Sequence, residues 1–564
     1  MLVVLLGSGV ASAEDPVQAS AADDPTTTSV VFNDDLDLRY WRVDERLPDP
    51  ADLPVFNYVE QVNRLNATVV SGRWGLAMQL DEVALLANRY VLDGVLYVER
   101  DLVAAGTPSL FPPGSDVYVN LEKIRGSFET KIATVQLGDT YVAFGRGLAL
   151  NLNRNVDIDI DTSVQGTKVV LRPGAWDLSL VAGQANRQQV SQDIPNDEIY
   201  GDLRHAIAGL RAERFGLGPA HVGAHGVFYN FVDEPGWGPG IEGIGTGPDV
   251  VTGGVTTELV GVGGVDWFAE GDVFGYGPDQ PSPLGPEAPD LGYGLYASAA
   301  AYPGAFVVLV EGKRYFQTER VNATLTPELY EVAVAPTLEY ERVITEDSSA
   351  AVNSNDITGG RVQVDWAAVP GELVPNATVA VFRDDDLTVL HFNDVPETIV
   401  HPIVGIEWIA AETSLLANVG YRWDLRDGTA GGADRHLHGD LLLHVPLPGA
   451  LMGAVSLYGE WFRWGNNPLQ QSDYYEVETG WTLLYGSRLA LTAYADQTTN
   501  PLVNSTGNID EQTYAAIELQ VKPAPDWTVK AFYGAYKAGI RCSGGQCRRL
   551  PGFDGARLSV VGGF

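Results

Sequence analysis

Three aspartates alternate with two isoleucines in the stretch NVDIDIDTS. On a strand, Asp157, Asp159 and Asp161 would share one face, because successive side chains point to opposite faces. Like charges about 7 Å apart repel one another and attract Ca²⁺ or Mg²⁺, which prefer oxygen ligands. The stretch predicts a lumen wall that binds cations, with structural Ca²⁺ as the one cofactor suggested. The alternative is a solvated acidic face.

A second polar face occurs in DRHLHGDLLLH, residues 434–444. On a strand, four potential metal ligands would lie opposite a leucine face: His436, His438, Asp440 and His444. Histidines at positions i and i+2 of a strand can chelate a transition metal. The pattern predicts a weak metal site, and ordinary polar lumen residues are the alternative.

The two cysteines, Cys542 and Cys547, enclose the short sequence SGGQ. In an exported protein, two cysteines this close predict a disulfide, with a metal-binding or redox pair as the alternative. The basic residues beside them, Arg541, Arg548 and Arg549, suggest either a lipopolysaccharide contact or a solvated loop.

Catalytic motifs are missing from the sequence, which has no GxSxG, HExxH or P-loop. We therefore expect no enzymatic activity and assign no catalytic residue. The formal net charge of −37 has the wrong sign for binding nucleic acid.

The polar faces described above form only if these residues lie on strands. The sequence pattern predicts strands along the whole chain. In RPGAWDLSLVAGQANRQ, residues 172–188, a tight turn precedes apolar and polar residues in alternation. Eleven such turns are predicted, at 71–74, 125–128, 172–176, 216–220, 263–267, 302–305, 370–373, 410–414, 447–451, 485–489 and 523–527. Each interval between turns holds two strand-like runs and a polar loop. The pattern predicts an antiparallel up-and-down transmembrane β-barrel of about 24 strands (22–26) with short periplasmic turns and long extracellular loops.

Tryptophan follows four of these turns, at Trp74, Trp176, Trp267 and Trp527. Aromatic rings with a polar edge favour the membrane interface, so these residues predict an interface girdle rather than core filler. In TYAAIELQVK, Ile517 lies on the apolar side and Glu518 on the other, so the apolar side is predicted to face lipid.

The chain is divided into three parts: residues 1–13 as the remnant of an export signal peptide, 14–29 as a disordered segment, and 30–564 as one barrel. No run approaches the 18 apolar residues of a membrane helix. A barrel of 24 strands would have a backbone diameter of roughly 45–50 Å, which requires a constriction. The longest loops, 84–114 and 320–359, are the predicted constricting elements, unless a partner protein fills the lumen.

The C-terminal sequence GARLSVVGGF places Leu558, Val560 and Phe564 on one face. A terminal aromatic after alternating apolar residues looks like the assembly signal of outer-membrane barrels, which implies recognition by the barrel assembly machinery.

The stretch LGDTYVAFGRGLALNLNRNVDIDIDTSVQGTKV, residues 137–169, resembles a family of large uncharacterised bacterial outer-membrane β-barrels classed as a domain of unknown function. The residues that carry this resemblance are Gly138, Asp139, Phe144, Gly145, Arg146, Gly147, Leu148, Asp161, Thr162, Ser163, Gly166, Lys168 and Val169, and VAPTLEYERVITED at 334–347 is similar to the family's external segment. The resemblance implies a barrel in the outer membrane of a Gram-negative envelope, with "FGRGL" ending a strand. It implies no activity.

These patterns together predict a porin-like channel in the bacterial outer membrane for passage of a solute or a polymer. The alternative is a non-catalytic scaffold of an envelope complex for secretion, adhesion or motility, with a partner in the lumen. The expected partners are outer-membrane lipid, lipopolysaccharide, the barrel assembly machinery, and a periplasmic or lumen-occupying protein.

Overall fold

The structure, a computed structural model, describes residues 28–41, 58–86, 89–92, 95–98, 117–155, 160–188, 206–230, 249–276, 291–316, 318, 356–385, 396–426, 433–465, 473–500, 512–537, 539–543, 546–550 and 553–563. The predicted signal remnant at 1–13 lies outside this set. Among the described residues, no helix has the length and apolar character needed to cross a membrane.

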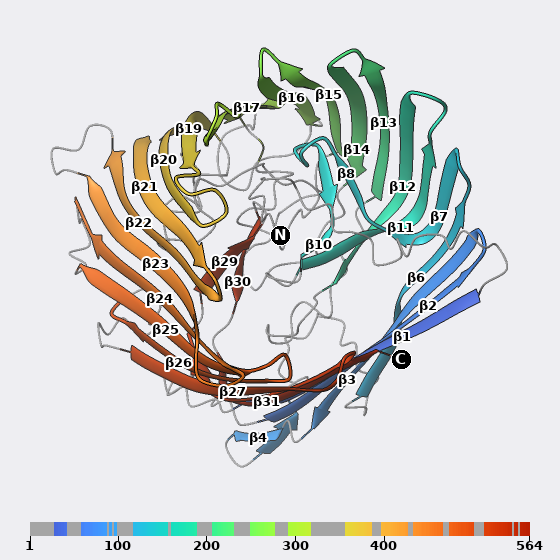
Figure 1. Cartoon of the computed structure of the whole chain (residues 1–564). Helices are drawn as coiled ribbons and strands as arrows, with labels where there is room; N and C mark the ends of the chain where they lie inside the picture. Colours follow the sequence, from blue (N-terminus) through green and yellow to red (C-terminus); the bar gives the residue numbers. More distant parts are fainter. Residues whose placement is uncertain are drawn as a thin grey trace.

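Twenty-four antiparallel strands form one closed β-barrel, which confirms the predicted fold class and strand number (Figure 1). They are β1 Thr28–Trp41, β2 Tyr58–Ser71, β3 Trp74–Leu86, β6 Val117–Glu129, β7 Ala133–Thr140, β11 Ile160–Leu171, β12 Trp176–Gln188, β13 Ala206–Leu217, β14 Ala220–Asn230, β15 Asp249–Val262, β16 Val265–Tyr276, β17 Leu291–Ala301, β18 Phe306–Phe316, β19 Ile357–Trp366, β20 Leu373–Asp384, β21 Glu397–Ala410, β22 Thr413–Arg426, β23 Asp434–Pro446, β24 Leu451–Arg463, β25 Tyr474–Tyr485, β26 Leu489–Thr498, β27 Gln512–Ala524, β28 Trp527–Tyr536 and β31 Phe553–Gly563.

The ring closes where β1 pairs with β31, from Asn33 opposite Gly563 to Trp41 opposite Gly555. Each wall strand otherwise pairs with the preceding and the following wall strand. Closure leaves no free terminal strand, and such a strand would expose unpaired backbone groups to hydrocarbon.

In the described parts of the long connections lie seven shorter strands. They are β4 Arg89–Leu92 and β5 Val95–Val98; β8 Val142–Phe144, β9 Leu150–Leu152 and β10 Arg154–Asn155; and β29 Gly539–Ser543 and β30 Gln546–Leu550. In Figure 1, β8, β10, β29 and β30 project within the outline of the ring.

Two Pro-Gly turns show why these sequences make tight hairpins. The Trp176 amide donates to the Pro173 carbonyl at 3.3 Å, and the Phe306 amide donates to the Pro303 carbonyl at 3.2 Å. In each turn only the first central residue has a positive φ, and Gly174 and Gly304 adopt it at +67°. This is the type II′ arrangement, whose twist matches that of paired strands.

One predicted turn is wrong. The residues at 125–128 lie inside β6, and the turn between β6 and β7 falls at 130–132. Thr130 forms this turn without glycine or proline, because its hydroxyl accepts the Ala133 amide at 2.9 Å and its own amide donates to the Ala133 carbonyl at 2.7 Å. Gly126, which suggested the turn, is paired in the ladder with Leu76 and Leu137. The other predicted turns all fall between the two strands of a hairpin.

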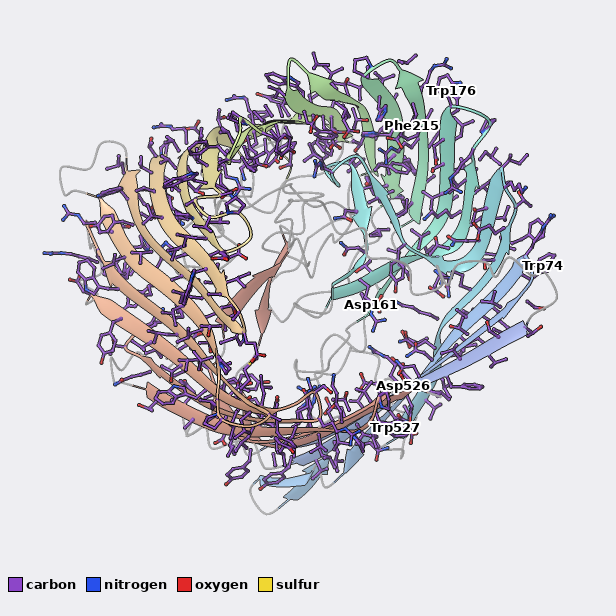
Figure 2. All side chains as sticks on the ribbon, viewed as in Figure 1. Trp74, Asp161, Trp176, Phe215, Asp526 and Trp527 are labelled. Carbon is purple, nitrogen blue, oxygen red and sulfur yellow. The ribbon has the colours of Figure 1, made fainter. Side chains whose placement is uncertain are left out.

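The outer face of the wall is apolar. The four tryptophans are 37 to 65% exposed and begin, or nearly begin, the strands that follow short turns. Figure 2 shows Trp74 and Trp176 on the outside of the ring and Asp161 on the inside. Ile517 is 47% exposed. Exposed and buried residues alternate within a strand, as in the exposed Leu80 beside the buried Asp81 and the exposed Leu180 beside the buried Val181.

The last strand carries two of the three predicted assembly-signal residues. Leu558 is exposed and Val560 is half-buried, while Phe564 lies outside the described residues. Because β31 pairs with both β28 and β1, this strand completes the ring. Its role as an assembly signal stays a prediction.

We expect Ile517→Asp to lower the yield of folded barrel, because a carboxylate in the hydrocarbon zone costs about 1–3 kcal/mol. Gln520→Asp, on the opposite face of the same strand, should fold normally. The measurement is the fraction of protein with heat-modifiable mobility on gels. Equal yields for the two variants would contradict the assignment of the lipid face.

Candidate functional site: a lumen constriction

The wall is interrupted where β7 leaves β6. Their pairing runs only from Glu129 opposite Thr134 to Arg125 opposite Gly138, whereas β7 stays paired with β11 as far as Thr140. Gly138 allows this departure with a φ of +98°, and a Cβ there would lie 1.9 Å from the Ile124 carbonyl oxygen. Asp139 then accepts the freed Ile124 amide at 2.9 Å. The Gly-Asp pair therefore directs the chain inward.

The residues that follow, 141–155, form what we call the inward segment. It contains β8, β9 and β10, and β10 pairs with the start of β11 through Arg154 opposite Asp161. The loops predicted to constrict the lumen, 84–114 and 320–359, lie mostly outside the described residues. From the sequence we did not expect 141–155 to be a constricting element.

An ion pair spans the interruption in the wall. Lys123 of β6 donates to Asp161 of β11, and the Tyr141 hydroxyl donates to the same carboxylate oxygen at 2.6 Å. The Arg154 Nε lies 3.6 Å from the other oxygen. Burial, with the carboxylate beside it, raises the pKa of the Tyr141 phenol, which therefore stays protonated as a donor.

This arrangement changes the interpretation of the aspartate triplet. Asp161 lies inside the ring, but Lys123 and Arg154 neutralise it, so it is not a free ligand for a cation. Asp157 and Asp159 lie outside the described residues. Cation binding by these two, and the structural Ca²⁺, stay predictions.

The "FGRGL" motif forms the connection between β8 and β9 rather than the end of a wall strand. The Gly147 amide donates to the Phe144 carbonyl at 2.9 Å, which closes the turn. Gly145 and Gly147 have φ values of +59° and +98°. A strand does end at this motif, as expected, since Phe144 is the last residue of β8, but β8 is a short strand of the inward segment and the glycines then reverse the chain.

An apolar cluster fixes the inward segment to one side of the ring. From the segment it includes Val142, Phe144, Leu148, Ala149, Leu150 and Leu152; from the wall, Val164, Val181, Ile207, Val227, Tyr229, Val250, Phe274, Tyr315, Ile357, Phe382 and Ile399. Burial of each large apolar side chain contributes about 1.5–3 kcal/mol. The Tyr229 hydroxyl also donates to the Ala149 carbonyl. The segment thus packs against strands β11 to β17, and the same cluster continues along the wall to β21.

Polar contacts join the tip of the segment to β16. The Arg146 amide donates to Glu270 Oε2 at 2.6 Å, and the Arg146 guanidinium lies 4.8 Å from the centroid of the Phe268 ring. A Cβ on Gly145 would lie 2.0 Å from Glu270 Oε1. The motif therefore needs glycine beside this carboxylate.

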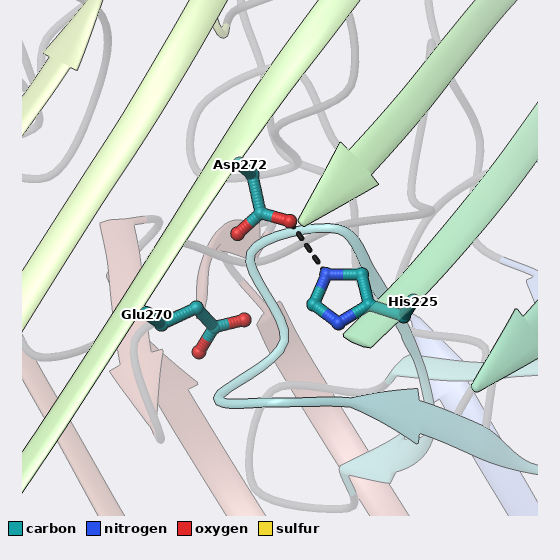
Figure 3. A group of neighbouring side chains, drawn as sticks. All are labelled: His225, Glu270 and Asp272. Atoms are coloured by element: carbon teal, nitrogen blue, oxygen red, sulfur yellow. Dashed lines mark hydrogen bonds and ion pairs between the residues drawn. The ribbon is translucent and has the colours of Figure 1, made fainter. Parts of the chain in front are cut away.

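Glu270 belongs to a buried group with His225 and Asp272 (Figure 3). His225 Nε2 and Asp272 Oδ1 are 2.6 Å apart, although β15 lies between their strands. Gly254 of β15 stands opposite both residues, and a Cβ there would lie 1.9 Å from Asp272 Oδ1 and 2.5 Å from His225 Nε2. The absent side chain is what lets the two groups meet.

Other buried carboxylates of the lumen face are joined to basic side chains. The pairs include Arg39–Asp37, Arg64–Asp81, Arg361–Glu311, Arg422–Asp424 and Lys537–Glu476. Isolated ions are costly to bury, so charges in a crowded lumen are retained where a neighbouring strand supplies the opposite sign.

The predicted histidine site is not assembled. His436, His438, Asp440 and His444 do share the lumen face, but each contacts a different partner. Asp424, Asn418 and Ser414 of the neighbouring β22 contact His436, Asp440 and His444, respectively, and His401 of β21, two strands away, contacts His438. In the described part of the chain, the only three-residue group with metal-binding geometry is His225, Glu270 and Asp272. Residues two apart on a strand stand about 7 Å apart, too far for one ion to reach all four.

The cysteines stand directly opposite each other in the β29–β30 hairpin. Paired residues have Cα atoms about 4.5–5.5 Å apart, within the range that a disulfide spans. The disulfide stays a prediction.

Comparison with known proteins gives likeness at the level of fold. No family model matches the sequence, and no curated protein matches it. Among solved structures, the translocation pore of the P pilus usher PapC of E. coli aligns with 10% identity and a TM-score of 0.42, over 95% of this chain and 99% of that chain.

Two further structures come from Pseudomonas aeruginosa. The siderophore receptor PirA aligns with 8% identity and a TM-score of 0.44, over 96% of this chain and 81% of that one. The outer membrane protein OpdK aligns with 11% identity and a TM-score of 0.36, over 74% of this chain and 97% of that one. These similarities extend no further than the barrel architecture.

We expect Gly254→Ala to destabilise the barrel by about 1–3 kcal/mol, because the methyl group separates His225 from Asp272 and leaves buried polar atoms unpaired. Its neighbour Gly253 has no atom within 4 Å of a built Cβ, so Gly253→Ala is the matched control. The temperature at which the heat-modifiable band converts should fall for the first variant only. A similar fall in both would show that β15 merely needs glycine.

Proposed function

We propose that the protein is an outer-membrane channel whose lumen is narrowed by the inward segment and carries polar solutes. Its apolar outer band would contact lipid and lipopolysaccharide, and the barrel assembly machinery would insert it. The single observation that carries this proposal is a closed 24-strand barrel with an apolar outer face and a charged inner face.

The outer face supports a membrane location. Large apolar side chains stand exposed on strand after strand, for example Leu180, Leu210, Val255 and Leu295 at 49 to 61% exposure. In water such a surface would cause the protein to aggregate, whereas in a bilayer it is the face that contacts lipid. The tryptophans beside the short turns suit one membrane interface.

The inner face supports passage of polar solutes. Ion pairs on several strands and hydroxyl-bearing side chains cover it, and one small pocket on it is lined by Tyr296, Glu311, Lys313, Arg361 and Phe382. The inward segment packs against strands β11 to β17, so it narrows the lumen from one side. We propose passage rather than catalysis, because the sequence has no GxSxG, HExxH or P-loop motif.

The test is conductance of the purified protein in planar bilayers. We expect Phe144→Asp with Leu150→Asp to give larger current steps, because loss of these two buried side chains costs about 3–5 kcal/mol each and releases the segment. Ala143→Asp is the control, since Ala143 is the exposed residue of β8.

Equal steps from wild type and the released variant would contradict the constriction. A folded wild type that conducts no ions would contradict the channel itself, and would favour a scaffold whose lumen is occupied by a partner.

A further inference from the structure

We propose that His225, Glu270 and Asp272 bind a divalent transition-metal ion, and that this ion fastens the inward segment to the barrel wall. This role in seating the segment is independent of what passes through the lumen.

The three side chains converge on one point from β14 and β16 (Figure 3). One potential ligand atom from each lies within 4.8 Å of the others. A tetrahedral ion with bonds of about 2.1 Å holds its ligands about 3.4 Å apart, so shifts of roughly 1 Å would complete coordination.

Polar atoms of this group are buried without a hydrogen-bond partner. Glu270 is 3% exposed and Asp272 is 1% exposed, and Glu270 Oε1, Asp272 Oδ2 and His225 Nδ1 accept or donate no hydrogen bond. A buried carboxylate oxygen without a donor is expensive, and a bound cation removes that cost.

The contacts of these two carboxylates differ from those in the other lumen clusters. In the other lumen clusters described above, a lysine or arginine pairs with the carboxylate, whereas Asp272 contacts His225 and Glu270 contacts a backbone amide. The nearby guanidinium of Arg146 is over the Phe268 ring. Arg211, which stands opposite His225 in the β13–β14 ladder, is ion-paired with Glu213.

The donor set indicates which ion would bind. One imidazole nitrogen and two carboxylates match a zinc-class site with three protein ligands and an open position for water. Ca²⁺ and Mg²⁺ prefer oxygen ligands throughout, so the histidine selects against them.

The ion would act on the inward segment through Glu270. Its Oε2 already holds the Arg146 amide, and its Oε1 is free for the metal. One carboxylate would thus join the ion to the β8–β9 turn. A metal bound here stabilises the seated segment by mass action, because released segments lose the Glu270 contact.

The first experiment measures Zn²⁺ binding to the full chain in detergent after chelator treatment, by calorimetry and by metal analysis. We expect one Zn²⁺ per chain, with Ca²⁺ unable to compete. Asp272→Asn and Glu270→Gln should each weaken binding by about two orders of magnitude or more, since changes to groups that only support the ligands already cost about 10–100-fold. Both replacements keep the shape of the side chain.

The matched control is His401→Gln with His438→Gln, which alters the other buried histidine pair of the lumen face. Its affinity for Zn²⁺ should equal that of wild type. Folded wild type that takes up no Zn²⁺, or carboxylate variants with unchanged affinity, would overturn the proposal. The carboxylates would then be neutralised by protons or by Arg211.

The second experiment reports the seating of the segment. Ala149 is fully buried, so Ala149→Cys, in a background with Cys542 and Cys547 replaced by serine, should react slowly with a maleimide. Zn²⁺ should slow the reaction further in this protein and have no effect when Asp272→Asn is added. Ala143→Cys, which is exposed, should react quickly throughout. A labelling rate of the Ala149→Cys protein that does not depend on Zn²⁺ would overturn the link between metal and segment.

Discussion

The pairing of β1 with β31 is the interaction on which the rest of the structure depends. It joins the two ends of the described chain by an antiparallel ladder from Asn33 to Trp41, and so converts a long sheet into a ring without free end strands. Only a closed wall satisfies all of its backbone groups in hydrocarbon. Closure also gives every strand an inside and an outside, and this is why period-two alternation sorts apolar residues outward and charged residues inward.

Closure also determines the ion pairs of the lumen face. Charged side chains that point into the ring must pair with side chains on nearby strands. Register then decides which residues meet. Where partners stand two strands apart, a glycine in the strand between them is required. Gly254 serves His225 and Asp272 in this way, and Gly420 serves His401 and His438, since a Cβ on Gly420 would lie 2.1 Å from His438 Nε2.

The sequence was sufficient for the properties that depend on local pattern. Alternation and turn chemistry predicted the barrel, its 24 strands and its apolar outer face, because both act within a few residues. The turn at 130–132 was not predicted, because Thr130 forms it with its own hydroxyl and without glycine or proline. The group of His225, Glu270 and Asp272 was not predicted, for a different reason. Its three residues lie on two strands and are brought together by the ladder register and by a glycine without a side chain. Their spacing in the sequence therefore forms no recognisable motif. The signal that could have predicted this group is a glycine whose ladder partners on both neighbouring strands are polar.

The interrupted pairing between β6 and β7 explains why the constriction begins inside the wall. Most long connections start at the end of a strand. Here β7 separates from β6 at Gly138 while it still pairs with β11, and the inward segment follows. The Lys123–Asp161 ion pair and the short β10 strand occupy the place that β7 vacates. The segment is therefore anchored at both ends by the wall itself and held along its length by apolar burial and by Glu270. A loop attached in this manner cannot swing clear as a unit without breaking the contacts that Tyr141 and Arg154 make with Asp161. The structure thus favours a fixed constriction over a free lid, and any gating would have to act on the side chains at the tip of the β8–β9 turn.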